Sequence, residues 1–375
     1  MKIVVPKEIT ENETRVSLVP QSVKKITKKD IEVSVEAHAG EQAGFSDKDY
    51  EEAGAKIIND AALLYNSADL IIKIRAPELN KKTNKHETDL MKEGSALVSL
   101  LFPLINLETV KRLASRKISA FSLDSIPRIT RAQSMDVLSS MSTVTGYKAV
   151  LIAAETLPKF FPMLMTAAGT VSPAKVFIIG AGVAGLQAIA TARRLGAVVE
   201  AFDTRPPVKE QVESLGARFV ELDLSGESTE GTGGYAKEVS KDLHKRELEL
   251  IGAHLKKSDV VITTALVPGK KAPVLITEAM VKELQYGSVI IDLASEQGGN
   301  CELTEPGKIV QKYGVTICGL LNLPATMPNH ASQMFSKNME NVIFHLVKNN
   351  ELNFDLNDEI NKGAVITHNG VILHQ

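Results

Sequence analysis

The chain has 375 residues, of which 44% are hydrophobic and 23% charged, and its formal net charge is -2. This length suits about two domains, and the balance of residue types excludes a disordered or fibrous chain. The near-zero net charge provides no basic field for nucleic acid or anionic lipid. Because tryptophan is absent, the core must consist mainly of Val, Ile, Leu, Ala and Met.

The cysteines and histidines give no sign of a disulfide framework or a metal site. Cys301 and Cys318 form no C-x-x-C pair, which indicates a reduced, intracellular protein. The histidines form no H-E-x-x-H pattern, so no metal is expected. Cys301 follows G-G-N, but without an assigned histidine partner a bystander thiol is favoured over a nucleophile.

Nothing in the sequence predicts secretion or membrane insertion. The N-terminus, MKIVVPKEIT, has no apolar stretch long enough for a signal peptide. The most apolar region, 176–202, is interrupted by glycines and charged residues, so no uninterrupted membrane span is predicted. We therefore expect a cytoplasmic protein.

The first third of the chain alternates short apolar runs with helix-like stretches. Strands are predicted at 2–5, 32–37, 70–74, 96–100 and 118–122. Helices are predicted at 21–28 and 47–53, and Gly54 marks the end of the second one. Alternation of strands and helices indicates a parallel α/β sheet.

A second strand series is expected between two long helices. The helices are predicted at 131–161 and 329–348, and the strands at 175–179, 198–202, 218–220, 259–263, 288–292 and 315–318. The tail, 363–374, is predicted to form a hairpin around Asn369-Gly370. The strand series has the spacing of a complete doubly wound dinucleotide domain.

These elements predict an α/β protein with two Rossmann-like, doubly wound parallel-sheet domains. Two long helices would join the domains, with a cleft between them. The first domain would be discontinuous, comprising residues 1–135 and 329–375, and the second would comprise residues 136–328.

A glycine loop follows the strand predicted at 175–179. Gly180, Gly182 and Gly185 form G-x-G-x-x-G directly after a β-branched run and at the start of a helix. The first glycine permits a tight turn, the second lets a pyrophosphate approach the backbone, and the third allows close packing of helix and strand. The phosphates would bind the free N–H groups at the helix N-terminus.

Asp203 ends the next predicted strand, where an acidic side chain accepts hydrogen bonds from the ribose hydroxyls of NAD and repels the 2′-phosphate of NADP. Arg205 complicates this interpretation, because an arginine nearby can hold a 2′-phosphate. NAD is still favoured over NADP. Val183, Thr204, Ala265 and Leu266 complete the expected cofactor-binding set in this region of the chain.

A polar segment, 128–140, lies at the predicted start of the first long helix. It reads R-I-T-R-A-Q-S-M-D-V-L-S-S, an unusual set of residues for the start of a helix that links two domains. Asp and Ser at such a place are also common helix caps. The residue types alone therefore leave a ligand-binding role and a capping role both open.

The segment R-A-Q-S-M-D-V-L-S-S, followed by G-Y-K-A-V-L, resembles the NAD(H)-binding soluble subunit of proton-translocating NAD(P) transhydrogenase. The resemblance extends over most of the chain. It includes F-P-M-L-M-T-A-A-G-T-V, G-A-G-V-A-G-L-Q, G-G-Y-A-K-E, I-T-T-A-L-V-P-G-K-K and I-D-L-A-S-E-Q-G-G-N. Together these motifs are highly specific.

The resemblance implies a nicotinamide site and a mobile loop. Arg128, Gln133, Asp136 and Ser139 stand at the positions that surround the nicotinamide in that family. Arg128 and Gln133 would contact the ring and its carboxamide, and the other two would orient them. In the turn-rich region that starts at Ser225, Gly233, Gly234 and Tyr235 match a loop that closes over bound nucleotide; without the family match this region would be an ordinary surface linker.

The resemblance also implies a reaction and partners. Hydride would pass directly from NADH on this chain to NADP+ on a partner subunit, so the protein would orient the ring and exclude water. The chain would form a homodimer and dock on an NADP(H)-binding subunit and a membrane-embedded proton-channel subunit. It would be held at the inner membrane by these partners, without inserting directly.

Two alternatives remain. The layout also resembles alanine dehydrogenase, and Arg15 and Lys73 stand where that enzyme binds carboxylate and carbonyl groups. However, the histidine that this resemblance predicts in the strand-end segment after Lys73 is replaced by Phe102. The aspartate expected just before Q-G-G is replaced by Glu296. Because Phe102 cannot donate a proton to a keto acid, Arg15 and Lys73 are interpreted as structural ion-pairing residues. The second alternative is a non-enzymatic NAD(H)-binding module.

Overall fold

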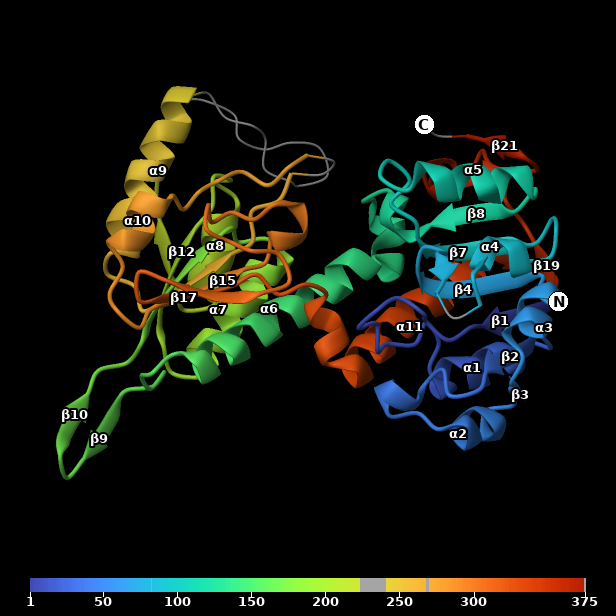
Figure 1. The fold of residues 1–375 in the computed structure, drawn as a ribbon, viewed down its shortest axis with the longest axis horizontal. Helices are drawn as coiled ribbons and strands as arrows, with labels where there is room; N and C mark the ends of the chain where they lie inside the picture. The colour runs from blue at the N-terminus through green and yellow to red at the C-terminus, as the bar shows by residue number, and fades with distance from the viewer. Residues whose placement is uncertain (82, 223–240, 268–269, 374–375) are drawn as a thin grey trace. The chain divides into compact units, whose positions relative to one another are not determined.

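The computed structural model describes residues 1–81, 83–222, 241–267 and 270–373 (Figure 1). It divides into two compact units: Met1–Met141 with Pro324–Gln375, and Ser142–Leu323. The first boundary lies inside helix α6 (Val137–Thr156) rather than before it, and both boundaries lie a few residues from those expected from the sequence.

Unit 1 contains an eight-stranded sheet in the order β21-β20-β8-β7-β4-β1-β2-β3. The strands are β1 (Lys2–Val5), β2 (Glu32–Glu36), β3 (Lys56–Ile58), β4 (Leu70–Arg75), β7 (Ala96–Leu100), β8 (Ser119–Ser122), β20 (Val365–His368) and β21 (Val371–Ile372). The run from β3 to β8 is parallel and doubly wound, and the C-terminal hairpin β20–β21 adds antiparallel strands at one edge. Its central strands are buried on both faces, which explains their continuous apolar sequence.

The other elements of unit 1 surround this sheet. They are α1 (Pro20–Thr27), α2 (Asp47–Glu52), α3 (Ala61–Asn66), α4 (Glu87–Leu90), α5 (Leu107–Ser115), α11 (Pro328–Leu346), α12 (Glu359–Ala364), the 3-10 turns η1 (Glu41–Ala43), η2 (Leu123–Ser125), η3 (Thr130–Met135) and η6 (Leu323–Thr326), and the short pairs β5 (Leu79–Asn80) with β6 (Lys85–His86) and β18 (Val347–Lys348) with β19 (Glu351–Leu352). The buried hydroxyls of Ser332 and Ser336 on α11 accept hydrogen bonds from the N–H groups of Val16 and Val19, at 3.0 Å each. This late helix is therefore tied to the segment that follows β1.

Unit 2 contains a seven-stranded sheet in the order β13-β12-β11-β14-β15-β17-β16. The strands are β11 (Lys175–Ile179), β12 (Val198–Phe202), β13 (Arg218–Val220), β14 (Val260–Thr263), β15 (Val289–Asp292), β16 (Ile309–Lys312) and β17 (Val315–Cys318). Six of these strands are parallel. Numbered 1 to 6 along the chain, β11, β12, β13, β14, β15 and β17 stand in the doubly wound order 3-2-1-4-5-6. The remaining strand, β16, pairs antiparallel with β17.

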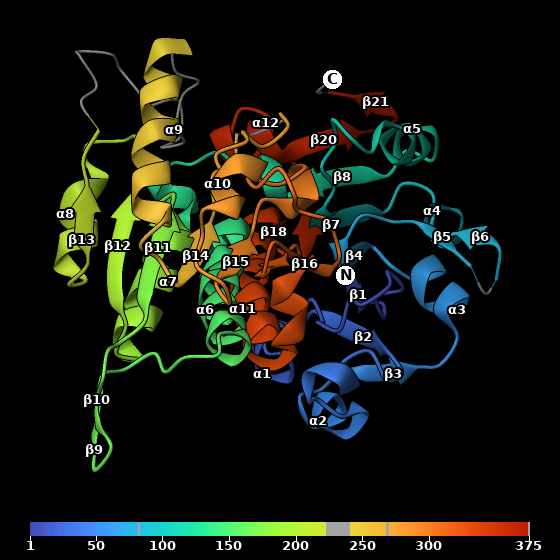
Figure 2. The same ribbon diagram turned by 60° about the vertical axis from the view of Figure 1, so that its left-hand side comes forward.

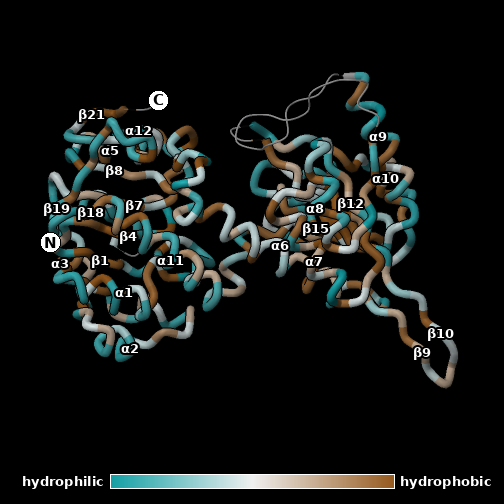
Figure 3. The backbone as a smooth tube through the Cα atoms, turned by 180° about the vertical axis from the view of Figure 1, so that it is seen from behind, coloured by the Kyte–Doolittle hydropathy of each residue, from teal (hydrophilic) through white to brown (hydrophobic). Residues whose placement is uncertain are grey.

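Helices cover both faces of the unit 2 sheet. They are α6, α7 (Val183–Arg194), α8 (Val208–Ser214), α9 (Lys241–Leu255) and α10 (Glu278–Lys282), with the 3-10 turn η5 (Ser295–Gln297). Alternate residues of β11 enter two separate cores: Val176 and Ile178 pack with α6, α7 and α8, whereas Phe177 and Ile179 pack with α9 and α10. Figure 3 shows the hydrophobic stretches concentrated on the strands.

The structure confirms the predicted fold class and most strand positions. The predicted tail hairpin is also present: β20 and β21 flank Asn369 and Gly370, whose φ angles are 49° and 85°, although His374 at its predicted end lies outside the described residues. Strands β3 and β16 and the hairpin of β9 (Leu164–Thr166) and β10 (Gly169–Val171) were not predicted from the sequence. These are short strands, most of them at sheet edges, with weak apolar patterns.

The prediction of one helix over 131–161 was wrong at both ends. Residues Thr130–Met135 form the 3-10 turn η3, and α6 begins only at Val137. The carboxylate of Asp136 accepts a hydrogen bond from the Ser139 N–H at 2.9 Å, which caps a new helix start. The helix ends before Pro158, because a proline disfavours helical backbone in the residue that precedes it.

Helix α6 is long and apolar enough to cross a membrane by length and composition alone. Core helices of soluble proteins meet the same test. Ala149, Val150 and Ala153 of this helix are fully buried in the unit 2 core. Gly146 brings α6 against the start of α7, since a Cβ built on Gly146 would lie 2.1 Å from the carbonyl oxygen of Ala184.

We predict opposite effects for alanine at two helical glycines. Gly146→Ala should lower the midpoint of thermal unfolding, because relieving that overlap costs about 1–3 kcal/mol or more. Gly252→Ala in α9 is the matched control and should raise this midpoint. Its new Cβ would lie 3.6 Å from Met280, an ordinary contact, and alanine is more favourable than glycine in a helix by about 0.5–1 kcal/mol. If Gly146→Ala were as stable as the wild type, the close approach of α6 and α7 would be contradicted.

Candidate dinucleotide-binding site

The glycine loop, residues 180–185, joins the end of β11 to the start of α7, and we call the place where it turns the glycine corner. Gly180 has a φ of 92°, and a Cβ there would lie 2.6 Å from the Thr264 hydroxyl oxygen. A Cβ on Gly185 would lie 1.9 Å from the carbonyl oxygen of Gly180. These two glycines are therefore required by backbone conformation and by close packing of the helix on the strand.

The N-terminus of α7 faces open space at this corner. Gly182 is the N-cap residue and offers no side-chain oxygen to the first N–H groups of the helix. A Cβ built on Gly182 would find, among the described residues, only the Arg205 guanidinium, 4.0 Å away. Val183, in the first turn, is 43% exposed. Free N–H groups beside open space fit the pyrophosphate of a dinucleotide.

Asp203 follows β12 and lies beside the glycine corner. Its side chain is only 5% exposed. One carboxylate oxygen accepts hydrogen bonds from the Ala181 N–H at 2.8 Å and from Arg205 Nη2 at 2.6 Å. The other accepts from the Arg205 N–H at 2.9 Å and from Arg205 Nε at 2.8 Å. Asp203 thus binds the glycine loop through the Ala181 N–H and also forms a bidentate ion pair with Arg205.

A third loop, after β14, completes the corner. The hydroxyl of Thr264 donates to the carbonyl oxygen of Gly180 at 2.9 Å, while Ala265 and Leu266 are half-buried. The fully buried Asn300 amide accepts from the Ala265 N–H at 3.0 Å and donates to the carbonyl oxygens of Ala265 at 2.9 Å and Pro273 at 2.8 Å. Asn300 therefore fixes the backbone of this loop.

Asn300 and Asp292 are two buried polar residues of this region that were not predicted from the sequence. Asp292 ends β15, is fully buried, and accepts hydrogen bonds from the hydroxyls of Thr263 and Thr304 and the N–H groups of Ala294 and Cys301, at 2.6–3.0 Å. Both residues lie within the motif I-D-L-A-S-E-Q-G-G-N, so the available signal was a run of polar residues after a buried strand.

The structure brings together a subset of the predicted cofactor-binding residues. The glycine loop, Asp203, Arg205 and Ala265 meet at the carboxyl edge of the unit 2 sheet, and Thr264, which was not predicted, joins them through its hydroxyl. Thr204, between Asp203 and Arg205, is half-buried. The predicted loop residues Gly233, Gly234 and Tyr235 lie outside the described residues.

The segment proposed for the nicotinamide lies in unit 1. Arg128 and Gln133 are exposed, whereas Asp136 and Ser139 are half-buried. Asp136 accepts from the Ser139 hydroxyl at 2.6 Å as well as from its N–H, so this pair caps α6. The Ser134 carbonyl oxygen accepts from the Asn338 and Asn341 amides of α11, which fixes the segment in place. Capping accounts for Asp136 and Ser139, while Gln133 presents its side chain to solvent.

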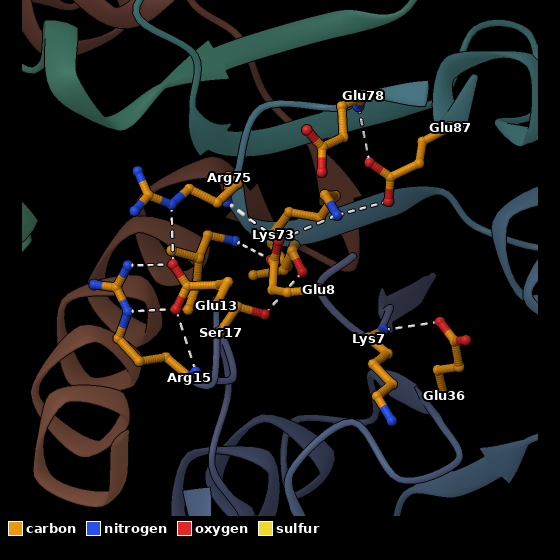
Figure 4. Close-up of polar contacts among 12 residues, drawn as sticks. Lys7, Glu8, Glu13, Arg15, Ser17, Glu36, Lys73, Arg75, Glu78 and Glu87 are labelled. Atoms are coloured by element: carbon orange, nitrogen blue, oxygen red, sulfur yellow. Dashed lines mark hydrogen bonds and ion pairs between the residues drawn. The ribbon is translucent and has the colours of Figure 1, made fainter. Parts of the chain in front are cut away.

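A buried ionic cluster in unit 1 lies in the segment after β1 and in the second half of β4 (Figure 4). Lys73, 1% exposed, pairs with Glu87 at 2.7 Å and Glu8 at 3.3 Å. Arg15 pairs with Glu13 at 2.6 Å, and Arg75 pairs with the same carboxylate at 2.9 Å. The interpretation of Arg15 and Lys73 as ion-pairing residues is confirmed.

Phe102 and Glu296 are the two positions at which this chain departs from the dehydrogenase alternative. Phe102, just after β7, has a φ of 45° and is 37% exposed. The exposed Glu296 accepts a hydrogen bond from the Asn322 N–H at 2.9 Å. Cys301 and Cys318 are buried, and burial raises the pKa of each thiol to about 11, which makes them poor nucleophiles. Among the described residues, no group of His, Cys, Asp and Glu could hold a metal ion.

Two doubly wound sheets, one with a complete glycine fingerprint and a strand-end acidic residue, define a dinucleotide-binding protein of the dehydrogenase type. Family models for the alanine dehydrogenase/PNT N-terminal and C-terminal domains match residues 4–145 and 149–375. The chain belongs to the alanine dehydrogenase/PNT family.

The relatives of this chain include transhydrogenase subunits and alanine dehydrogenases. The chain is 48% identical to an NAD(P) transhydrogenase subunit alpha chain of Rhodospirillum rubrum, over 100% of this chain and 98% of the relative. It is 33% identical to alanine dehydrogenase 2 of Staphylococcus aureus, over 88% of this chain and 82% of the relative. Among solved structures, transhydrogenase from Sinorhizobium meliloti matches with a TM-score of 0.89 and 40% identity, covering 99% of this chain and 100% of that one. An L-alanine dehydrogenase matches with a TM-score of 0.82 and 26% identity, covering 100% and 97%.

The ionic cluster predicts a specific pH dependence. Burial raises the pKa of Glu13, but hydrogen bonds and charge from Arg15 and Arg75 outweigh it and lower the pKa from 4.5 to about 2. A carboxyl whose pKa is lower in the folded state stabilises the fold above its unfolded pKa, and that stability is lost as pH falls toward 2. The contribution of Glu13 is about 3 kcal/mol.

Glu13→Gln should therefore flatten the fall in the free energy of unfolding between pH 4.5 and pH 2, as measured by chemical denaturation at several pH values. Glu51→Gln, on the exposed face of α2, is the matched control and should follow the wild-type profile. Parallel profiles for wild type and Glu13→Gln would argue against a strongly paired Glu13.

Proposed function

We propose that this chain is the NAD(H)-binding subunit of a proton-translocating NAD(P) transhydrogenase. The observation that carries the proposal is the glycine corner of unit 2, with its uncapped helix N-terminus, open space at Gly182 and strand-end Asp203. Similarity to curated transhydrogenase alpha subunits supports this branch over alanine dehydrogenase.

The residues at the corner fit the adenosine and pyrophosphate groups of NAD(H). The first N–H groups of α7 would bind the pyrophosphate, and Asp203 would accept hydrogen bonds from the adenosine ribose. The half-buried Ala265 and Leu266, fixed through Asn300, would line the path of the cofactor. When bound, NADH supplies the hydride that passes to NADP+ on a partner subunit.

The exposed side chains of Arg128 and Gln133 would position the nicotinamide. Neither needs to act as an acid or base, because direct hydride transfer moves no proton to or from the protein. Asp136 and Ser139 would support this segment by fixing the start of α6, as their hydrogen bonds to each other indicate. The task of the site is then orientation of the ring and exclusion of water.

A split assay on the purified chain tests this function. We expect NADH binding, no oxidation of alanine, and hydride transfer from NADH to an NADP+ analogue only when a purified NADP(H)-binding partner domain is added. Gln133→Ala should slow this transfer far more than it weakens NADH binding, since Gln133 would act on the ring. Arg194→Ala, an exposed change at the far end of α7, is the control.

Each outcome of this assay has a clear meaning. Alanine turnover by the chain alone would support the dehydrogenase alternative, despite Phe102 at the strand end. NADH binding with no transfer in the presence of the partner would support the non-enzymatic module. Equal losses of binding and transfer in Gln133→Ala would remove the proposed role of that residue.

We also infer that the chain works in a complex. The words "subunit alpha" in the names of its relatives support a multi-subunit assembly. The proposed partners are an NADP(H)-binding subunit and a membrane-embedded proton-channel subunit, which would hold this chain at the cytoplasmic face of the inner membrane. No nucleic acid is involved in this proposal.

A homodimer belongs to this proposal, and the hairpin β9–β10 supports it. The hairpin projects from the rest of unit 2 (Figures 1 and 2) and carries exposed apolar side chains: Met163 is 58% exposed, Met165 79% and Val171 39%. An isolated two-stranded hairpin is marginally stable in water. A second copy of the chain would cover these side chains.

Met165→Glu should weaken this dimer, because the new charge would be buried against the second copy. Sedimentation velocity should show a wild-type species of about twice 40.6 kDa and a shift toward monomer in the variant. Ile309→Glu, on the exposed edge strand β16, is the control and should leave the mass unchanged. A monomeric wild type, or an unaffected Met165→Glu dimer, would contradict the proposed contact.

A further inference from the structure

The carboxylate of Asp203 has no acceptor site left for a ribose. A carboxylate offers about four lone-pair positions, two on each oxygen. Here the N–H groups of Ala181 and Arg205, together with Nε and Nη2 of the Arg205 guanidinium, provide four donors, two to each oxygen. The acidic group expected to bind the cofactor is therefore saturated by the chain itself.

The two donors from the guanidinium are distributed as those of a ribose diol would be. Nε contacts one oxygen at 2.8 Å and Nη2 contacts the other at 2.6 Å. The 2′- and 3′-hydroxyls of a ribose bind a carboxylate in the same way, with one donor to each oxygen. The two backbone N–H donors would remain in place, so only the guanidinium has to leave for a diol to bind.

The guanidinium also lies beside the phosphate-binding corner. Nη2 is the described atom nearest to a Cβ built on Gly182, at 4.0 Å. Asp203 and Arg205 are both largely shielded from water, with side chains 5% and 15% exposed, so their pairing is not a loose surface contact. One arginine thus occupies the ribose acceptor and borders the space left for the pyrophosphate.

We propose that Arg205 is a specificity-determining residue that competes with the ribose diol for Asp203. This inference rests on the proposed binding of NAD(H). An NADH molecule must displace the guanidinium from Asp203 to bind. A nucleotide with a 2′-phosphate meets a carboxylate whose charge Arg205 offsets, and the positive guanidinium attracts that phosphate. Arg205 therefore weakens NADH binding and favours NADPH, opposing the selectivity that Asp203 provides.

The test is a comparison of NADH and NADPH affinities by calorimetry on the full chain without partners. Arg205→Ala should bind NADH about fivefold more tightly, because the diol no longer competes with an ion pair. It should bind NADPH more weakly, because Asp203 becomes an unpaired negative charge beside the phosphate. The ratio of the NADPH dissociation constant to that of NADH should rise roughly tenfold or more.

Two further variants separate a specific role from a structural one. Arg205→Lys retains the positive charge without the planar pair of donors, so it should give an intermediate ratio. Arg194→Ala removes an exposed arginine at the other end of α7 and should leave the ratio unchanged. If Arg205→Ala lowered the midpoint of thermal unfolding, the ratio of the two dissociation constants in Arg205→Lys would decide between a specific and a structural role. A general loss of folded protein lowers both apparent affinities together and leaves their ratio unchanged.

The outcomes are distinguishable. Tighter NADH binding with weaker NADPH binding in Arg205→Ala supports the inference. Weaker binding of both nucleotides, or an unchanged ratio, overturns it while leaving the proposed function intact. A wild-type chain that binds no NADH at millimolar concentration overturns both.

Discussion

Unit 2 depends on the contact between the start of α7 and the end of β11. Gly185 has no Cβ, so the helix approaches the Gly180 carbonyl closely enough that a methyl group would overlap it at 1.9 Å. That approach aims the N–H groups of the helix at the corner and leaves Gly182 open. Asp203 then binds the loop through the Ala181 N–H, and Thr264 binds it through the Gly180 carbonyl. The chemistry proposed for the site follows from this packing and needs no reactive side chain.

Unit 1 repeats the doubly wound sheet but uses its carboxyl edge differently. Where unit 2 leaves donors available, unit 1 fills the segment after β1 and the end of β4 with charges that satisfy one another. Lys73 lies between Glu8 and Glu87, and Glu13 lies between Arg15 and Arg75. Replacing such pairs one residue at a time is costly, because the partner is left charged and buried. This edge of unit 1 is held by its ion pairs, and one fold therefore supports two different uses of the same edge.

The sequence allowed the fold class and most central strands to be predicted, because buried parallel strands such as β11 and β15 have continuous β-branched runs. The glycine fingerprint was equally clear, since Gly180 and Gly185 answer steric requirements and Gly182 leaves space at the helix start. Edge strands such as β16 were not predicted, because their apolar pattern is weak. The break in the helix before Val137 was not predicted either, because the apolar residues on both sides of it keep helical spacing and the new helix start depends on capping by Asp136. The pairing of Arg205 with Asp203 and the buried role of Asn300 depend on side-chain geometry, which spacing along the chain does not specify.

The insertion of unit 2 into unit 1 has a consequence for the order of events during synthesis. All strands of unit 2 lie between Ser142 and Leu323, so this unit is complete before the ribosome has made α11 or β20. Unit 1 must wait for both: β20 pairs with β8, joining Val365 to Phe121, and α11 supplies the buried serines beneath the segment after β1. Such distant pairings are slow to form, and domains fold as units during translation. The N-terminal half of unit 1 is therefore the segment of the nascent chain that stays unfinished longest, and the one with most need of protection from aggregation.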